Sequence, residues 1–345
     1  MKTCESVTEG HPDKVCDQIA DAILDAYLQR DPSSRVAVET FGSHGALMIG
    51  GEVTSTEEID LAAIAKRVYR DIGYDDEIEV FTNIEEQSPD IARGVDTGGA
   101  GDQGIMYGYA TSETPEYLPR PVVLAHKLAW GLTDLRRNHQ EFSWLRPDGK
   151  TQVTMVGPNV TAVVVSAQHS PDITIEEIRR LVLERLIAPI IGDLGNAAVH
   201  INPTGSFVSG GFMADTGLTG RKIMVDTYGG LMPHGGGAFS GKDPSKVDRS
   251  AAYMARYAAK NIVANGLAKN CLVSVAYAIG KESPVMLRAI SGEGKDLTAY
   301  LKEHFDFRPR AIIERLGLRR PIYRATAAYG HFGRDEFPWE HISLT

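Results

Sequence analysis

The first helix-like segment of the chain is marked by apolar residues at intervals of four: Val15, Ile19, Ile23 and Tyr27. This spacing puts them on one face and predicts an amphipathic helix. Pro12 suits the first helical position, because its missing N–H has no helical partner there. His11 is then the N-cap, and Asp13 lies in the first turn, beside the positive end of the helix dipole.

Aspartates recur at the same interval along this helix: Asp17, Asp21 and Asp25. A regular row of carboxylates on an amphipathic helix is most simply its solvated face, so we expect these three side chains in water. Asp13 has two interpretations. It either stabilises the helix dipole or helps to bind a cation, and the spacing alone leaves both open.

Further along, strand-like and helix-like patterns alternate. Residues 35–41 and 46–53 surround a glycine-containing turn and predict a hairpin. The pair Ser55 and Glu58 forms a capping-box pattern that predicts a helix over 55–71. Later strands are expected over 160–167, 223–228 and 271–279, and helices over 121–138, 175–191, 250–264 and 297–305.

This strand and helix rhythm occurs three times, which predicts an α+β fold of three similar layered units. The glycine-rich span between Gln87 and Gly104 predicts a lid or linker and the first domain boundary. The predicted divisions are 1–90 for an N-terminal domain, 91–101 for the lid or linker, 102–209 for a central domain and 210–345 for a C-terminal domain.

Composition limits the classes of protein that fit. No apolar run approaches the ~18 residues that cross a membrane, and the first residues lack an apolar signal region, so we expect a soluble, cytoplasmic protein with no membrane partner. A net charge of −9 argues against a broad nucleic-acid surface. Cys4, Cys16 and Cys271 form no Cys-x-x-Cys pair, so we expect buried, reduced thiols rather than disulfides or zinc ligands.

Flexible backbone and charge are densest between Gly229 and Arg249. Lys242 and Lys246 supply positive charge there, and Asp243 and Asp248 are suited to hold a cation that shares phosphates. Glycines in this stretch let backbone N–H groups approach an anion closely: Gly235, Gly236, Gly237 and Gly241. The stretch is therefore interpreted as a polyphosphate cradle.

Two other interpretations of this loop stay open. Gly236, Gly241 and Lys242 follow the G-x-x-x-x-G-K spacing of a phosphate-loop NTPase or kinase. However, Asp243 stands where that motif needs Ser or Thr, and Pro244 follows where its helix should begin. A mobile glycine loop followed by an exposed charged turn is the other interpretation. The pattern favours a phosphate site of a different design.

Taken together, these segments resemble the S-adenosylmethionine synthetase (methionine adenosyltransferase) family over nearly the whole chain. The most specific stretch is Gly-Gly-Gly-Ala-Phe-Ser-Gly-Lys-Asp-Pro-Ser-Lys-Val-Asp-Arg-Ser, residues 235–250. The other matching stretches are 5–14, 50–52, 87–91, 99–104, 144–148, 217–222 and 326–333.

The resemblance implies three domains related by pseudo-threefold internal symmetry, in a homodimer whose active sites are shared between subunits and which often pairs into a tetramer. It implies ATP and L-methionine as substrates. Methionine sulfur attacks C5′ of ATP, and the displaced tripolyphosphate is hydrolysed to diphosphate and phosphate. The implied cofactors are two Mg²⁺ per site and K⁺.

The resemblance also implies a role for individual residues. The catalytic set is His11, Lys150, Arg221, Lys222, Lys242 and Lys246. ATP is contacted by His11, Asp148, Lys150, Phe207, Asp215, Arg221, Lys222, Ala238 and Lys242. Methionine is contacted by Glu52, Gln87, Asp102, Asp215 and Lys246. Asp13 and Asp248 bind Mg²⁺, and Glu39 belongs to the K⁺ site.

The chain departs from the family pattern in two places. Ser206 stands where the family usually has Arg or Lys, and the lid between Asp90 and Asp102 is shorter than is typical. These departures leave a non-catalytic or regulatory relative as the alternative function. A short lid is expected to alter gating more than chemistry.

Overall fold

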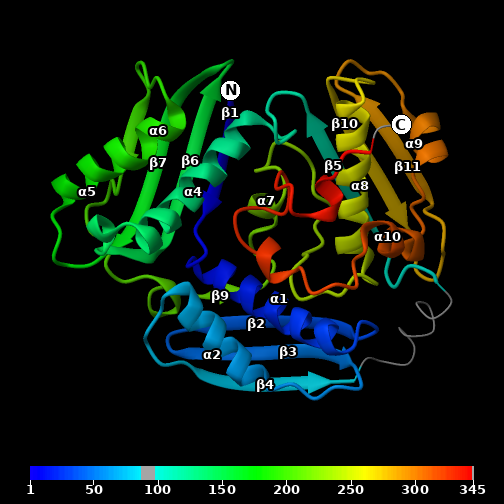
Figure 1. Cartoon of the computed structure of the whole chain (residues 1–345), viewed down its shortest axis with the longest axis horizontal. Coiled ribbons are helices and arrows are strands. Elements are labelled where there is room, and N and C mark those ends of the chain that lie inside the picture. Colours follow the sequence, from blue (N-terminus) through cyan, green and yellow to red (C-terminus); the bar gives the residue numbers. More distant parts are fainter. Residues whose placement is uncertain (87–97, 344–345) are drawn as a thin grey trace.

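The computed structural model describes residues 1–86 and 98–343. Each of three sheets contains an antiparallel hairpin, and the sheets surround the C-terminal segment in Figure 1. The hairpins are β2 (Arg35–Ser43) with β3 (Ala46–Thr54), β6 (Leu145–Val156) with β7 (Asn159–His169), and β10 (Asn270–Tyr277) with β11 (Met286–Ser291). The expected α+β fold of three similar units is confirmed.

Each hairpin is completed by an antiparallel edge strand from a different part of the chain. β9 (Gly217–Leu218) pairs with β2, β1 (Lys2–Val7) pairs with β6, and β5 (Gly104–Thr111) pairs with β10. Two sheets gain a parallel strand on the other side, β4 (Glu79–Glu85) on β3 and β8 (Ala198–Ile201) on β7.

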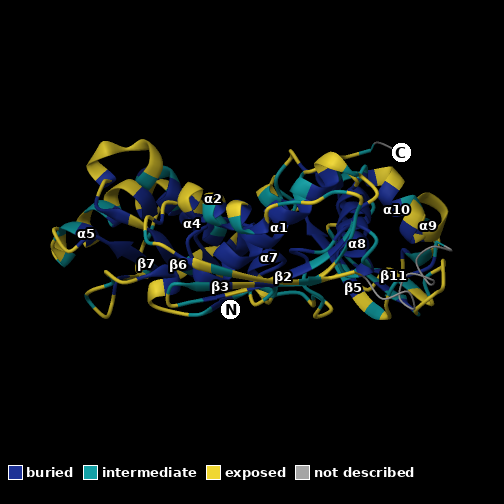
Figure 2. Ribbon diagram, turned by 90° about the horizontal axis from the view of Figure 1, so that it is seen from below, coloured by how far each residue is buried: buried dark blue, intermediate teal, exposed yellow. Residues whose placement is uncertain are grey.

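Three long helices cover one face of the sheets. α1 (Pro12–Arg30) packs on β2, α4 (Arg120–Asn138) on β6 and α8 (Val247–Ala264) on β5 and β10. Figure 2 shows α1 and α2 (Leu61–Ile72) on one side of the molecule and β2, β3 and β5 on the other. The remaining helices are α5 (Ile175–Val182), α6 (Ala188–Ile191), α7 (Ile223–Asp226), α9 (Thr298–His304) and α10 (Pro309–Leu316).

Each long helix precedes the central hairpin of its own unit, yet the strand before that helix belongs to another unit's sheet. In chain order, β1 precedes α1 but pairs with β6, β5 precedes α4 but pairs with β10, and β9 precedes α8 but pairs with β2. The three units thus exchange their first strands in a closed cycle. The domain divisions at residues 90, 101 and 209 stay predictions from the sequence.

Small residues let α8 lie close to its sheet. A Cβ built on Gly108 of β5 would lie 2.0 Å from the carbonyl carbon of Ala255, so only glycine fits at that position. The buried face of α8 is correspondingly rich in alanine: Ala251, Ala252, Ala255, Ala258 and Ala259. The predicted helix over 250–264 is therefore confirmed, with its start at Val247.

Two predicted elements were wrong in type or position. Residues 223–226 form the short helix α7 and 227–228 a turn, where a strand over 223–228 was expected, and Asp226 at the end of α7 is buried against Lys14. The second helix begins at Leu61 with Asp60 as N-cap, because the Ser55 hydroxyl instead bonds Ser34 and the backbone N–H of Glu57. The expected helix over 175–191 contains a π-helical turn over Leu183–Ile187.

The expected solvated aspartates on α1 were also wrong. Asp17 and Asp21 are fully buried, and Asp25 is partly buried. The reason is that loops from later in the chain cover this face of α1 and donate backbone N–H groups to the three carboxylates. All three cysteines are buried and free, as expected. Within residues 1–86 and 98–343, no helix has the length and apolar character that would let it cross a membrane.

Candidate functional site

The N-terminus of α1 presents a neutral histidine. Pro12 occupies the first helical position and His11 is the N-cap, as predicted. The Nδ1 atom of His11 accepts the backbone N–H of Asp13 at 3.2 Å, which places the ring proton on Nε2. Burial, followed by the nearby charges of Lys222 and Lys150, lowers the pKa of His11 to about 2. His11 is therefore a neutral hydrogen-bond donor.

Asp13 holds a cationic segment against the same helix end. One carboxylate oxygen accepts the backbone N–H of Leu218 at 3.0 Å, and the other lies 2.5 Å from Nζ of Lys222. Nε of Arg221 lies 3.5 Å from this carboxylate. Two of the predicted phosphate-binding cations, 205 or more residues away in sequence, are thus brought to His11.

Asp148 lies beside this group with unused bonding capacity. Burial raises its pKa to about 6; Lys150 opposes the shift and Asp215 adds to it. One oxygen accepts the backbone N–H of Gly211 at 3.0 Å, whereas the other, also buried, has no hydrogen-bond partner among the described residues. An orphaned buried acceptor calls for a donor from a ligand or water.

Phe207 and Ser206 lie on the loop that follows β8. The backbone N–H of Phe207 donates to Nε2 of His169 at 3.0 Å, and its carbonyl accepts the His169 backbone N–H at 2.9 Å. These two bonds fix the loop, while the Phe207 side chain stays half-buried and Ser206 is exposed.

The glycine loop lies between two sheets. A Cβ on Gly235 would lie 1.9 Å from the carbonyl oxygen of Ile105, and one on Gly241 would lie 1.8 Å from that of Val38. Both glycines have positive φ, +86° and +79°. Two of the loop's glycines therefore serve close packing against β5 and β2, a reason that the sequence did not reveal.

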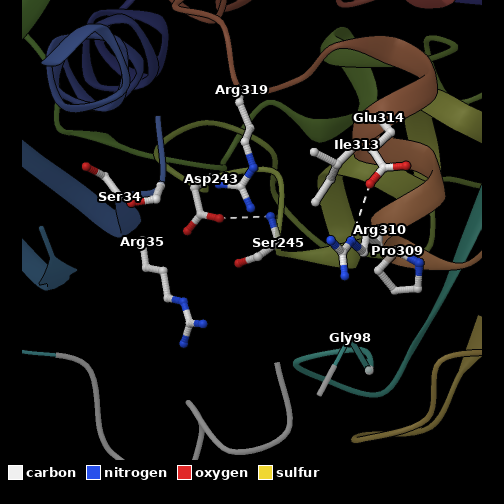
Figure 3. A pocket seen from close by; sticks show the side chains of 12 residues that line it. Ser34, Arg35, Gly98, Asp243, Ser245, Pro309, Arg310, Ile313, Glu314 and Arg319 are labelled. Carbon is white, nitrogen blue, oxygen red and sulfur yellow. Dashed lines mark hydrogen bonds and ion pairs between the residues drawn. The ribbon is translucent and has the colours of Figure 1, made fainter. Parts of the chain in front are cut away.

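The charged residues of this loop form two ion pairs. Nζ of Lys242 lies 2.7 Å from Asp248, and Nζ of Lys246 lies 2.5 Å from Asp243. Asp243 also accepts the backbone N–H of Val36 at 2.7 Å, which fixes the loop to β2. Figure 3 shows Asp243 and Ser245 on the wall of an adjoining pocket.

A second group of predicted site residues gathers on the open face of the sheet β4-β3-β2-β9. Glu39, Glu52 and Lys242 line one cavity there, together with Leu218. The backbone of Leu218 is bonded to Asp13, so β9 connects this group to the His11 group. The Lys242–Asp248 pair completes the second group.

The other predicted residues are placed as follows. Ala238 lies beside Gly220, where an added Cβ would approach the Ala238 Cβ to 2.6 Å. Asp102 is exposed and accepts the backbone N–H of Gln103. Gln87 and residues 91–97 of the predicted lid lie outside the described residues.

An apolar row crosses the same open face. Leu218, Phe41, Met48 and Phe81 are direct cross-strand neighbours from β9 to β4. Phe41, Met48 and Phe81 are 48%, 44% and 47% exposed. Such a contiguous exposed row is typical of a protein interface.

Comparisons with known proteins agree over the whole chain. Sequence models described as the N-terminal, central and C-terminal domains of S-adenosylmethionine synthetase match residues 1–89, 97–207 and 209–341. The chain belongs to the S-adenosylmethionine synthetase family. The resemblance expected from the sequence is thereby confirmed.

Individual relatives support this S-adenosylmethionine synthetase assignment. The S-adenosylmethionine synthase of Sorangium cellulosum is 53% identical over 98% of this chain and 86% of its own length. Those of Desulforudis audaxviator and Thermus thermophilus are 54% and 52% identical, over 99% of this chain and 95% of their own lengths. The chain is therefore an enzyme of the methionine adenosyltransferase type that synthesises S-adenosylmethionine.

Proposed function

We propose that this enzyme joins methionine to ATP in one displacement. The methionine sulfur forms a bond to C5′, the C5′–O bond breaks, and its electron pair leaves with tripolyphosphate. Water then cleaves a P–O bond of the tripolyphosphate to give diphosphate and phosphate. Because a thioether has no proton to lose, the first step needs in-line placement and a stabilised leaving group rather than a general base.

The observation that carries this proposal is the neutral, buried His11 beside a set of cations. Its Nε2–H is suited to donate to the oxygen that leaves C5′, because a neutral imidazole can donate a hydrogen bond without repelling the neighbouring lysines. Lys150, Arg221 and Lys222 lie on the His11 side, whereas Lys242 and Lys246 lie on the glycine loop. We assign all five to the polyphosphate chain.

The metal roles rest on the chemistry of the donors. Among the described residues, no three His, Cys, Asp or Glu side chains cluster to hold a metal. Mg²⁺ needs only one or two carboxylates when phosphates and water complete its shell, so Asp13 and Asp248 fit this use. Two Mg²⁺ ions would neutralise phosphate charge, and Glu39 would contribute to the K⁺ site. Asp13 and Asp248 now pair with Lys222 and Lys242, which would turn to the phosphates.

The remaining roles concern substrate recognition. We assign the orphaned oxygen of Asp148, Asp215, the ring of Phe207 and Ala238 to ATP. We assign methionine binding to Glu52, Gln87, Asp102, Asp215 and Lys246. The domain divisions and the cytoplasmic location predicted from the sequence belong to the same proposal.

We further propose a homodimer with shared active sites, which can pair into a tetramer. Both the apolar row and the cavity that holds Glu39, Glu52 and Lys242 lie on the open sheet face. The adjacent sheet adds Ile105 and Met286, which are 46% and 36% exposed and lie in register on either side of Ala276. A second copy seated on this face would cover the apolar residues and close the site.

The deciding experiment incubates the purified protein with ATP, methionine, Mg²⁺ and K⁺ and follows S-adenosylmethionine, diphosphate and phosphate by mass spectrometry. All three products are expected in equal amounts. Omission of Mg²⁺ should abolish turnover, and replacement of K⁺ by Na⁺ should slow it. ATP binding without S-adenosylmethionine formation would instead favour the non-catalytic relative, and equal rates in K⁺ and Na⁺ would count against the Glu39 site.

A further inference from the structure

The first three aspartates of the row on α1 fix two segments that come from later in the chain, residues 217–222 and the glycine loop. Asp13 accepts the backbone N–H of Leu218, and Asp17 accepts that of Gly220 at 2.8 Å. Asp21 accepts the backbone N–H of Gly241 at 2.8 Å. These loops carry Arg221, Lys222 and Lys242, three of the cations assigned to the polyphosphate.

Both inner aspartates are paired with buried cations. Nζ of Lys14 lies 2.8 Å from Asp17, and the guanidinium of Arg249 makes bonds of 2.6 and 2.8 Å to the two oxygens of Asp21. Arg249 also donates to the backbone carbonyl of Lys242 at 3.2 Å, so it holds the loop from a second point. Charge-assisted bonds of this kind are stronger than neutral ones and fix geometry.

A single helix can fix the positions of these loops relative to one another. Residues four apart rise by about 6 Å on the same face, so Asp13, Asp17 and Asp21 are fixed points in one line. A backbone N–H that bonds to one of these carboxylates is therefore held at a fixed position along the helix. The backbone N–H of Gly220 lies directly before Arg221, and that of Gly241 directly before Lys242.

We propose that Asp17 and Asp21 are positioning residues, which preset the Arg221–Lys222 and Lys242 loops for the leaving polyphosphate without touching a substrate. This inference rests on the proposed function of those cations. It predicts that loss of either the Asp17 or the Asp21 carboxylate slows the chemical step because the cations are displaced, even though the catalytic side chains are all present.

Asp17→Ala and Asp17→Asn test this directly. Alanine removes the acceptor for Gly220, and a loop displaced by about 1 Å is expected to slow single-turnover S-adenosylmethionine formation by about 10²-fold. Asparagine keeps an oxygen for the Gly220 N–H but removes the charge beside Lys14. If positioning is the cause, Asp17→Asn should be clearly faster than Asp17→Ala at saturating substrates.

The chain offers a matched control in Asp25. It lies two turns further along α1 than Asp17, and it accepts the backbone N–H groups of Tyr323 and Arg324 at 2.9 and 2.8 Å. That segment carries none of the proposed phosphate cations. Asp25→Ala is therefore expected to lower stability but to leave the single-turnover rate within about twofold of wild type.

Amide hydrogen exchange followed by mass spectrometry gives a readout that does not depend on activity. In Asp17→Ala, and to a smaller extent in Asp17→Asn, residues 217–222 should lose protection while α4 and α8 keep theirs. Equal rate losses in Asp17→Ala and Asp25→Ala, or unchanged exchange over 217–222, would overturn the inference. An inactive wild-type enzyme would refute the proposed function instead, because hydrogen exchange would still show whether Asp17 holds residues 217–222 in place.

Discussion

His11 shows how one backbone contact sets the chemistry of a side chain. The N–H of Asp13 takes the lone pair of Nδ1, and burial among cations disfavours a second proton. An imidazolium would repel the same lysines that serve the polyphosphate. A neutral ring avoids that conflict and still offers one donor.

The depressed pKa of His11 predicts how stability depends on pH. In the unfolded chain His11 takes a proton near pH 6.5, but in the folded protein it does so only near pH 2. Its contribution to stability is therefore fully present above pH 6.5 and is lost as the pH falls. Between pH 6 and 4, the free energy of unfolding of wild type should fall more steeply than that of His11→Asn, by about 1.4 kcal/mol per pH unit. Equal slopes would mean that His11 is protonated in the folded protein.

A substitution at Lys242 tests the effect of charge on the leaving group separately from substrate binding. Lys242→Met keeps most of the bulk and removes the charge, so single-turnover S-adenosylmethionine formation should fall by about 10²–10³-fold while the KM for ATP changes much less. Lys302→Met, on an exposed turn of α9, is the control and should match wild type. A Lys242→Met rate within about twofold of wild type would remove the glycine loop from the leaving-group site.

The roles of single residues were predictable where they depend only on neighbours in the sequence. Pro12 and the polar start of α1 gave the N-cap correctly, because capping depends on a few neighbouring residues. The aspartate row was misjudged because burial depends on loops that come from residues 218–324. One signal was available: Cys16, Ala20 and Leu24 form a second apolar face beside the first, so the apolar surface of α1 is wider than the single stripe of a surface helix.

At the level of elements, the open face of the sheet β4-β3-β2-β9 has the clearest consequence for assembly. Phe41→Glu places a charge in the centre of the apolar row, directly opposite Leu218 and Met48. We expect this variant to sediment as a monomer and to lose most of its activity. Thr154→Glu, on the sheet of β6, is the control and should leave the oligomeric state unchanged. A Phe41→Glu variant that stays dimeric would place the interface elsewhere.

Elements were predicted best where they were long. The hairpin β2–β3 and the helices α4 and α8 lie close to their predicted ranges. The strand predicted over 223–228 was wrong: residues 223–226 are helical, and Asp226 makes a buried contact with Lys14 that no local pattern encodes. β9 has only two residues, too few to produce a recognisable alternation.

At the scale of the whole molecule, the exchanged first strands join the three units into one. Val7 of β1 is buried, although the sheet that it completes is otherwise built from residues 145–201. Val7→Ala should lower the stability of the entire protein by about 2 kcal/mol and leave a single calorimetric transition. Val156→Ala, at a half-exposed position of β6, should have little effect. Two resolved transitions would show that the units unfold separately.

The same exchange determines how a growing chain meets its partners on the ribosome. β2 is complete at Ser43, but its outer neighbour β9 is not made until Gly217 and Leu218, and β1 waits for β6. At ordinary elongation rates the edge of β2 therefore stays unpaired for on the order of ten seconds or more. An unpaired strand edge invites pairing with another chain. Nascent chains are thus most prone to aggregate before the third unit emerges, and a chaperone that shields strand edges during that interval should raise the yield of folded enzyme.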